Sequence, residues 1–419
     1  MGAILLLPHA STHENARRAA YWSLHLWQTT FDACSAACGA GLLTYHPIRD
    51  YTHIGIAALT LIAVAGAVWF VGACANAEAK LGIAPFCASP RPAATARAAW
   101  LISAGFCTAI ASIAAIREDS TTPWLSALFG LRTAAGFGAA ASESLSLTGA
   151  LCAFALLGPS VISLCLLWRS FGAIWRPMMR QFAFAAGLLL LLAFTNVLFE
   201  QPRRFGAPAR GADPAAITPD GVIERGIRAS YAIVGAANGV GGVVPLDSST
   251  RDGTRVILAA AILAGGGAGS AAGGLRWTLL AALFGTRRTA HAGDHPHAIR
   301  GATVAARRTL RALLILTGTV AIGILLIDSI VGVRFGRPIQ LGDALLDAAS
   351  AVGGAGLGGE AVATITSRNL STGIGHASDL YPYGMLWVML AMVLGRLVPL
   401  WMMQRAARHM TPQQREGAA

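Results

Sequence analysis

The chain has 419 residues, of which 55% are hydrophobic and only 12% are charged, and its net charge is +12. A soluble domain carries about 25% charged residues, so this composition excludes an ordinary soluble protein and predicts one that crosses a membrane several times. A nucleic-acid-binding protein can have the same positive charge. Here the basic residues lie mostly in loops between apolar segments, so we expect no nucleic-acid partner.

Seven apolar segments follow one another along the chain, and a bilayer requires about 20 such residues per helix. We predict membrane spans at residues 54–73, 98–116, 145–168, 182–199, 256–284, 313–331 and 384–403. Loops are expected at 75–97, at 201–220 and, with strongly basic character, at 287–311. The seven cysteines show no CxxC pair and no Cys/His zinc spacing, so they are interpreted as small apolar residues.

Shorter apolar pieces, at 21–37, 123–129, 222–234 and 347–357, alternate with the spans and lead into glycine-rich turns. Two of these stretches are near copies, because residues 32–42 and 347–357 are identical at 8 of 11 positions. A helical piece that is too short to cross the bilayer and ends in small residues is typical of a re-entrant half-helix. We therefore predict four half-helices, each of which ends in a turn inside the membrane.

Four turn glycines mark the repeat, and they are 95, 103 and 117 residues apart: Gly41, Gly136, Gly239 and Gly356. The spacing divides the chain into repeats at 1–74, 97–180, 181–290 and 310–405, followed by a tail at 406–419. The first repeat lacks most of its leading span, so either the start lies upstream of Met1 or this helix has been lost. The expected fold is an all-α polytopic membrane protein with four pore-loop repeats.

Four re-entrant turns that face one side of a membrane can surround a single axis and form a cation filter. Backbone carbonyls can replace the hydration shell of a cation, and the C-terminal ends of the half-helices add negative dipoles. The alternative is that these are simply glycine-rich loops in a glycine-rich chain. The predicted filter residues are Cys38, Gly39, Ala40, Gly41, Thr133, Ala134, Ala135, Gly136, Ala237, Asn238, Gly239, Val240, Gly354, Ala355, Gly356 and Leu357.

Several motifs resemble the Trk/Ktr/HKT superfamily of potassium transporters. The pattern Ser-Ala-x-x-x-x-Gly-Leu occurs at 35–42 and 350–357, and Ala135-Gly136-Phe137 is similar to the family's second filter. The run at 265–276 is close to the family's GGxxGSxAGGIK stretch, and residues 394–400 are close to its GR-x-x-P-L ending. The resemblance extends over nearly the whole chain.

The resemblance implies four M1–P–M2 repeats around a pseudo-fourfold axis, with K+ bound by the filter residues and with the first M1 helix mostly missing. It also implies a homodimer and a cytosolic nucleotide-binding regulatory subunit of the RCK type. No nucleotide-binding fingerprint and no acid–base cluster is found in the sequence, so we predict no enzyme activity and no bound cofactor.

The interruption of the fifth span consists of ten Gly, Ala and Ser residues at 265–274. Each Gly costs about 1 kcal/mol against Ala in a helix, so we predict a loop under the filter; the alternative is a surface for close helix packing. In the resembling family the matching loop gates the pore. This implies a gate made of Gly265, Gly266, Gly267, Gly269, Ser270, Gly273, Gly274 and Arg276. Arg276 is either a partner of the gate or an anchor at a helix end.

Arg396 lies within the last apolar span, where a charge costs at least about 2.5–3.5 kcal/mol. In the resembling family the matching arginine lies beneath the filter and acts as an electrostatic barrier in the pore. The alternative is a side chain that extends to the cytoplasmic surface. Arg132, beside the second filter, either repels cations at the mouth or points to solvent or an acidic partner.

The side chains of the filters depart from the family's pattern. Family members usually carry Thr before the glycine in some repeats, whereas the residues here are Ala40, Ala135, Asn238 and Ala355. All four turn glycines are present, and in the family glycine at these positions is associated with potassium selectivity. The leading interpretation is a potassium uptake subunit; the alternatives are a sodium-permeable or non-selective transporter and a non-conducting membrane subunit.

Charged residues set the expected orientation and surround the filters. The basic loops lie on one side, which the positive-inside rule assigns to the cytoplasm, so we expect a bacterial inner-membrane protein with a cytoplasmic C-terminus. The basic segment 287–311 is expected to contact the regulatory partner or anionic lipid. Four acids flank the filters and either attract cations or are solvated or capping residues: Asp32, Glu143, Asp347 and Glu360.

Overall fold

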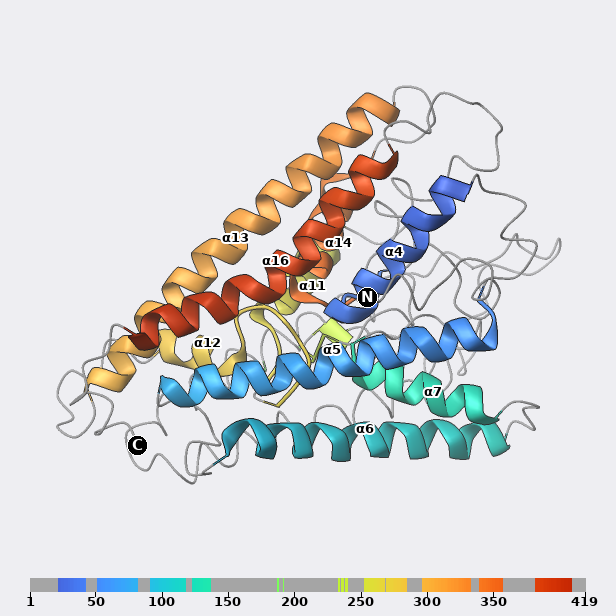
Figure 1. The fold of residues 1–419 in the computed structure, drawn as a ribbon. Helices are drawn as coiled ribbons and strands as arrows, with labels where there is room; N and C mark the ends of the chain where they lie inside the picture. The colour runs from blue at the N-terminus through green and yellow to red at the C-terminus, as the bar shows by residue number, and fades with distance from the viewer. Residues whose placement is uncertain are drawn as a thin grey trace, which may run out of the picture.

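The computed structural model describes residues 22–42, 51–81, 91–117, 123–136, 252–267, 269–284, 296–332, 339–356 and 381–408, together with 187, 191, 233, 235–236 and 238–239. These residues are almost entirely helical (Figure 1). The predicted span at 145–168, the span at 182–199 apart from residues 187 and 191, the leading part of the first repeat and residues 409–419 of the tail lie outside the described residues.

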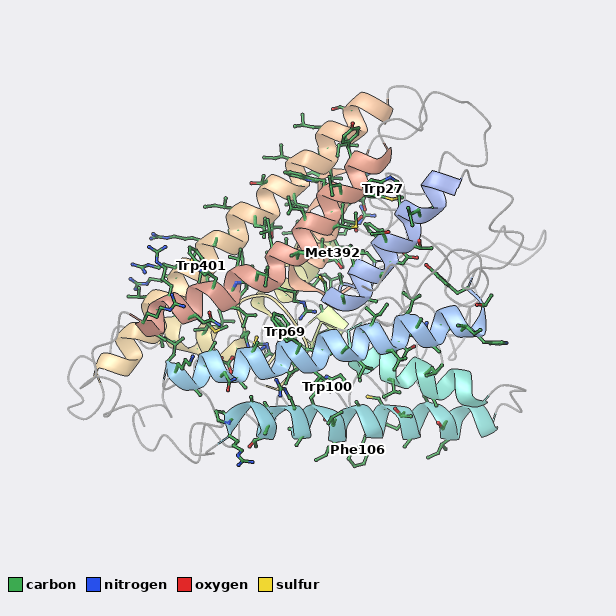
Figure 2. All side chains as sticks on the ribbon, viewed as in Figure 1. Trp27, Trp69, Trp100, Phe106, Met392 and Trp401 are labelled. Carbon is green, nitrogen blue, oxygen red and sulfur yellow. The ribbon has the colours of Figure 1, made fainter. Side chains whose placement is uncertain are left out.

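Four described helices are long and apolar enough to cross a membrane. They are α5 (His53–Lys80), α6 (Pro92–Arg117), α13 (Pro296–Gly332) and α16 (Tyr381–Arg408). Large apolar side chains on these helices are exposed, among them Leu61, Phe106 and Ile315. Figure 2 shows Phe106 on the side of α6 that faces away from the other helices. Such surfaces are stable in contact with lipid rather than water.

Three shorter helices match the predicted half-helices. They are α4 (Trp22–Cys38) with 17 residues, α7 (Pro123–Ala134) with 12 and α14 (Leu341–Gly353) with 13. None is long enough to cross a bilayer, which takes about 20 residues. In the third repeat, Ile233, Gly235, Ala236 and Asn238 are also helical.

The fifth predicted span is broken, as its composition predicts. Helix α11 (Asp252–Ala264) ends where the glycine run begins, and α12 (Trp277–Phe284) starts just after Arg276. The described residues between them are not helical. We call residues 265–276 the gate loop from here on.

Two predicted loop boundaries are wrong. Helix α5 continues to Lys80 and α6 already begins at Pro92, so much of the expected loop at 75–97 is helical. Alanine, glutamate and lysine favour helix, and proline is well tolerated in the first helical turn. The boundaries at 74 and 97 of the first two repeats therefore fall inside helices.

The basic segment before the sixth span is also helical in its second half. Helix α13 starts at Pro296, so Arg300, Arg307, Arg308 and Arg311 lie on a helix rather than in the expected loop 287–311. The reason is an amphipathic pattern, because the alanines at 302, 305 and 306 are buried while Arg307, Arg308 and Arg311 are exposed. The helix thus extends beyond its apolar part.

The helices pack so that the half-helices are enclosed by the long ones. Helix α14 packs against α11, α13 and α16, and α4 packs against α5 and α16. Helix α7 packs against α6 and α5. Figure 1 shows one end of each of α4, α7 and α14 close to the connection between α11 and α12. The ends of the half-helices and the gate loop therefore share the centre of the molecule.

Close contact between α4 and α5 depends on Gly66. A Cβ atom at this position would overlap the carbonyl of Ala37, whereas a Cβ at Gly105 on α6 would meet nothing within 4 Å. We expect Gly66→Ala to lower the melting temperature in detergent, since overpacking typically costs about 1–3 kcal/mol. Gly105→Ala should leave it unchanged or raise it slightly. Equal behaviour of the two variants would show that α4 and α5 do not pack at this point.

Candidate functional site: a centre of converging loops and buried arginines

The four turn glycines share one unusual backbone conformation. Their φ angles are 67° at Gly41, 79° at Gly136, 66° at Gly239 and 58° at Gly356. This left-handed region is strained for residues with a Cβ atom, so glycine is required at each turn. The repeated sequence therefore produces a repeated reversal of the chain at the end of each half-helix.

The turns also meet in space. A Cβ atom at Gly136 would lie 2.7 Å from the carbonyl oxygen of Gly239 and 3.0 Å from that of Gly39. A Cβ at Gly239 would lie 2.8 Å from the carbonyl oxygen of Gly354. Four segments more than 90 residues apart in sequence therefore bring backbone carbonyls to one point, which is the arrangement that coordinates a dehydrated cation.

The first and fourth turns approach each other most directly. A Cβ atom at Gly356 would lie 2.7 Å from the Cα of Gly41 and 2.9 Å from the carbonyl oxygen of Ala40. The two stretches that are similar in sequence are therefore also neighbours in the structure. Ser35 and Ser350, at matching positions of α4 and α14, are both buried, and neither hydroxyl has a hydrogen-bond partner.

The predicted filter residues within the described part of the chain all lie at this centre or in the last turn of a half-helix. Ala40, Thr133, Ala134, Ala135, Asn238 and Ala355 are buried. Trp100 of α6 donates a hydrogen bond of 3.1 Å to the carbonyl of Ala134, which fixes the second turn. Ala237, Val240 and Leu357 lie outside the described residues.

The gate loop lies against these turns. The amide of Gly273 donates to the carbonyl of Gly353, the last residue of α14, at 2.9 Å. A Cβ atom at Gly239 would lie 2.7 Å from the Cα of Ala272, so the loop also adjoins the third turn. Within the loop, the hydroxyl and the amide of Ser270 both donate to the carbonyl of Gly267. The loop therefore packs directly on the third and fourth turns.

Arg396 joins the filter to the gate loop. Its Nε donates to the carbonyl of Cys38 at 2.5 Å, and its Nη1 donates to the carbonyl of Ala271. Its guanidinium carbon lies 4.3 Å from the ring centroid of Phe70, a cation–π contact. Arg396 is 6% exposed, so the alternative of a side chain that extends to the surface is wrong.

Arg276 pairs with an acid that the sequence analysis did not single out. Its Nε lies 2.5 Å from Oε1 of Glu78, and both side chains are fully buried. Thr278 donates to the same Oε1 at 2.9 Å, and Arg276 Nη2 donates to the carbonyl of Gly267 at 3.1 Å. Loss of one member of a buried pair typically costs about 3–5 kcal/mol. Arg276, directly before α12, is therefore a fully buried residue that is held from α5.

A second ion pair, also absent from the sequence analysis, joins the third repeat to the fourth. Arg255 of α11 is buried and lies 2.9 Å from Asp343, in the first turn of α14. The same guanidinium lies 3.5 Å from Asp252 and donates to the side chain of Gln340 at 3.2 Å. These contacts fix the start of α14 relative to α11.

Two of the acids that flank the predicted filters are buried rather than solvated. Asp32 and Asp347, at matching positions of α4 and α14, are both buried. The hydroxyl of Tyr51 donates to Oδ2 of Asp32 at 2.7 Å, which ties α4 to the start of α5. The interpretation as solvated acids is wrong for these two residues. Glu143 and Glu360 lie outside the described residues.

Arg132 is buried at the end of α7, and its Nε and Nη1 donate to none of the described residues. The sequence analysis had weighed a side chain in solvent, which the 2% exposure contradicts. The charge lies in the last turn of the half-helix, where it offsets the negative end of the helix dipole. Helices α4 and α14 carry no basic residue in their last turns, so the second half-helix differs electrostatically from these two.

Apolar spanning helices, short half-helices and turns that converge on one carbonyl cluster define a helical membrane protein of the pore-loop type. No protein-family model and no curated protein matches the sequence. The fold is similar to the crystal structure of the potassium transporter TrkH from Vibrio parahaemolyticus, with a TM-score of 0.55. The two sequences are 17% identical, and the match covers 93% of this chain and 79% of TrkH. The similarity confirms the predicted fold class and shows that this chain is a divergent relative of TrkH in fold.

The buried charge of Arg132, whose Nε and Nη1 find no hydrogen-bond partner among the described residues, should make the protein less stable than a neutral variant. A favourable helix-dipole term contributes up to about 2 kcal/mol, whereas burial of an ion costs several kcal/mol. We therefore expect Arg132→Met, which keeps the apolar stem, to raise the melting temperature in detergent by at least about 2 °C. A lower melting temperature would show that the guanidinium has a stabilising partner.

Proposed function

We propose that this protein is a membrane subunit that passes cations through the converging loops, and that its ion is K+. The observation that carries the proposal is the meeting of carbonyls from Gly39, Gly239 and Gly354 around Gly136. Water is absent at this depth of a membrane, so such carbonyls need a partner, and a dehydrated cation is one. The fold shared with a potassium transporter supports the same conclusion.

The choice of K+ depends on the backbone rather than on side chains. All four turn glycines are present, which in the resembling superfamily goes with potassium selectivity. The small or amide side chains before them leave the carbonyl groups as the main ligands. A sodium-permeable or non-selective transporter is the alternative within the same class, and ion competition separates the two.

A non-conducting membrane subunit is the second candidate. Two observations favour it: Arg396 donates to the carbonyl of Cys38, and Arg132 places a buried charge at the end of the second half-helix. A fixed cation at the filter can take the place that a mobile cation would occupy. This candidate predicts a folded protein that inserts in membranes and carries no flux.

The assembly and orientation belong to the same proposal. We propose a homodimer in a bacterial inner membrane, with its C-terminus in the cytoplasm and with a cytosolic nucleotide-binding subunit as regulator. The exposed arginines of α13 that lie before its apolar part support a contact with such a partner or with anionic lipid. The activity is transport along the electrochemical gradient, without an enzymatic reaction or a bound cofactor.

Growth rescue of a bacterium that lacks potassium uptake tests the proposal, with 86Rb+ uptake as the direct measurement. Wild type should restore growth at low K+, and Na+ should compete poorly. Gly356→Ser should abolish uptake, because φ is 58° and the added Cβ would lie 2.7 Å from Gly41 Cα. Gly105→Ser, where a Cβ meets nothing within 4 Å, is the matched control and should behave like wild type.

Arg396→Ala should remove the positive charge beside the filter and raise the uptake rate if the protein conducts. A wild-type protein that is well expressed and inserted, yet carries no Rb+ or Na+, would overturn the transport proposal and favour the non-conducting subunit. Uptake of Na+ and Rb+ at equal rates would overturn only the choice of K+.

A further inference from the structure

One face of helix α5 carries an unusual set of buried residues. Phe70, Cys74 and Glu78 are spaced by four residues and are all buried, with exposures of 3%, 0% and 0%. Residues four apart lie above one another on the same side of a helix. We call these three residues the α5 stripe. Hydropathy does not explain why Glu78 is buried in this stripe, because an unpaired acid in a membrane span is costly.

The α5 stripe contacts both arginines at the centre. The ring of Phe70 lies under the guanidinium of Arg396, at 4.3 Å from the centroid, and Glu78 pairs with Arg276 at 2.5 Å. Arg396 comes from α16 and Arg276 from the gate loop, more than 100 residues apart in the sequence. A single helix face therefore holds two cationic side chains from different repeats.

Each arginine also donates a hydrogen bond to a different carbonyl of the gate loop. Arg276 donates to the carbonyl of Gly267, and Arg396 donates to the carbonyl of Ala271. Between these points the loop packs against the filter turns through Gly273 and Ala272. The loop is thus held in its position by contacts that begin on α5.

We propose that the α5 stripe positions the gate loop, and that release of Arg276 from Glu78 lets the loop leave the filter and raises cation flux. The proposal rests on the transport function proposed above. Glu78 and Phe70 are positioning residues, which act on the ion path through the two arginines. The backbone of Arg276 is left-handed, with φ 68°, which is a strained conformation for a residue with a Cβ atom.

Among the residues of the α5 stripe, Glu78 should hold the gate loop most strongly, because it carries the charge opposite to that of Arg276. If Glu78 becomes Gln, the shape of the stripe stays nearly the same, but Arg276 becomes a buried charge without a counter-ion. The loop then gains stability by moving Arg276 toward water. If Arg276 also becomes Gln, the buried charge disappears and the loop has no such reason to leave. The double variant should therefore behave more like wild type than either single variant.

The test compares Glu78→Gln, Arg276→Gln, the double variant and Glu78→Asp in purified protein reconstituted into vesicles. Lys80→Gln is the matched control, since Lys80 lies two residues further on the same helix and is exposed. We expect each single charge removal to raise the maximal rate of 86Rb+ uptake by at least about five-fold. The half-saturating concentration should stay constant, because the filter turns are unchanged. The double variant, Glu78→Asp and Lys80→Gln should remain near wild type.

A second measurement does not depend on transport. Cys74 lies between Phe70 and Glu78 and is fully buried, so a small water-soluble thiol reagent should leave it unmodified in wild type. In the single charge variants the loop should move away and Cys74 should react, as peptide mass spectrometry of that cysteine will show. The double variant should protect it again.

The outcomes separate the two proposals. Vesicles in which wild type carries no cation would overturn the transport function, and Cys74 labelling would still decide whether the stripe holds the loop. If wild type carries cations but Glu78→Gln changes neither the maximal rate nor the reactivity of Cys74, the stripe does not position the gate loop. A change in half-saturation alone would also overturn the inference, since that result would place Glu78 at the ion.

Discussion

Backbone carbonyls that leave helical hydrogen bonding inside a membrane must find other partners, and this constraint organises the centre of the protein. Water cannot reach such groups through lipid, so irregular backbone is tolerated only where protein or a wet cavity surrounds it. Here the described half-helices pack against the longer helices, which expose apolar side chains on their other faces. Partners for the carbonyls are supplied by arginine side chains, by loop amides and, under the proposed function, by the transported ion.

The buried arginines show three different ways to place a cation in this environment. Arg276 has a carboxylate partner in Glu78, and Arg396 has backbone carbonyls and an aromatic face. Two of the guanidinium nitrogens of Arg132 have no hydrogen-bond partner among the described residues. The first arrangement is the most sensitive to loss of one partner, because a full charge then remains buried. The second is more tolerant, since carbonyl dipoles are fixed and need no compensating proton or charge. Under the proposed function, the ion pair would hold a gate, and the fixed carbonyls would hold Arg396 as a barrier.

The sequence was informative where glycine determines the backbone and less informative where a helix passes beyond its apolar part. The turns at Gly41, Gly136, Gly239 and Gly356 could be located because a left-handed turn requires glycine, and the break at 265–276 because ten small residues cannot hold a helix. Glu78 was missed because hydropathy ended the first span at residue 73, whereas the helix continues to Lys80. The pairing of Glu78 with Arg276 joins residues almost 200 positions apart, and nothing local in either segment indicates it.

The pseudo-symmetry of the centre is incomplete, because the half-helices differ in the charged residues at their ends. Helices α4 and α14 match in their buried Asp and Ser residues and carry no basic residue of their own in the last turn, whereas α7 ends in Arg132. The negative end of α4 instead faces Arg396 of α16, which donates to the carbonyl of Cys38, the last residue of α4. Arg396 and the gate loop adjoin the same first and fourth turns through Cys38 and Gly353. A positive charge therefore lies beside both α4 and α7, supplied by α16 in the first repeat and by the half-helix itself in the second.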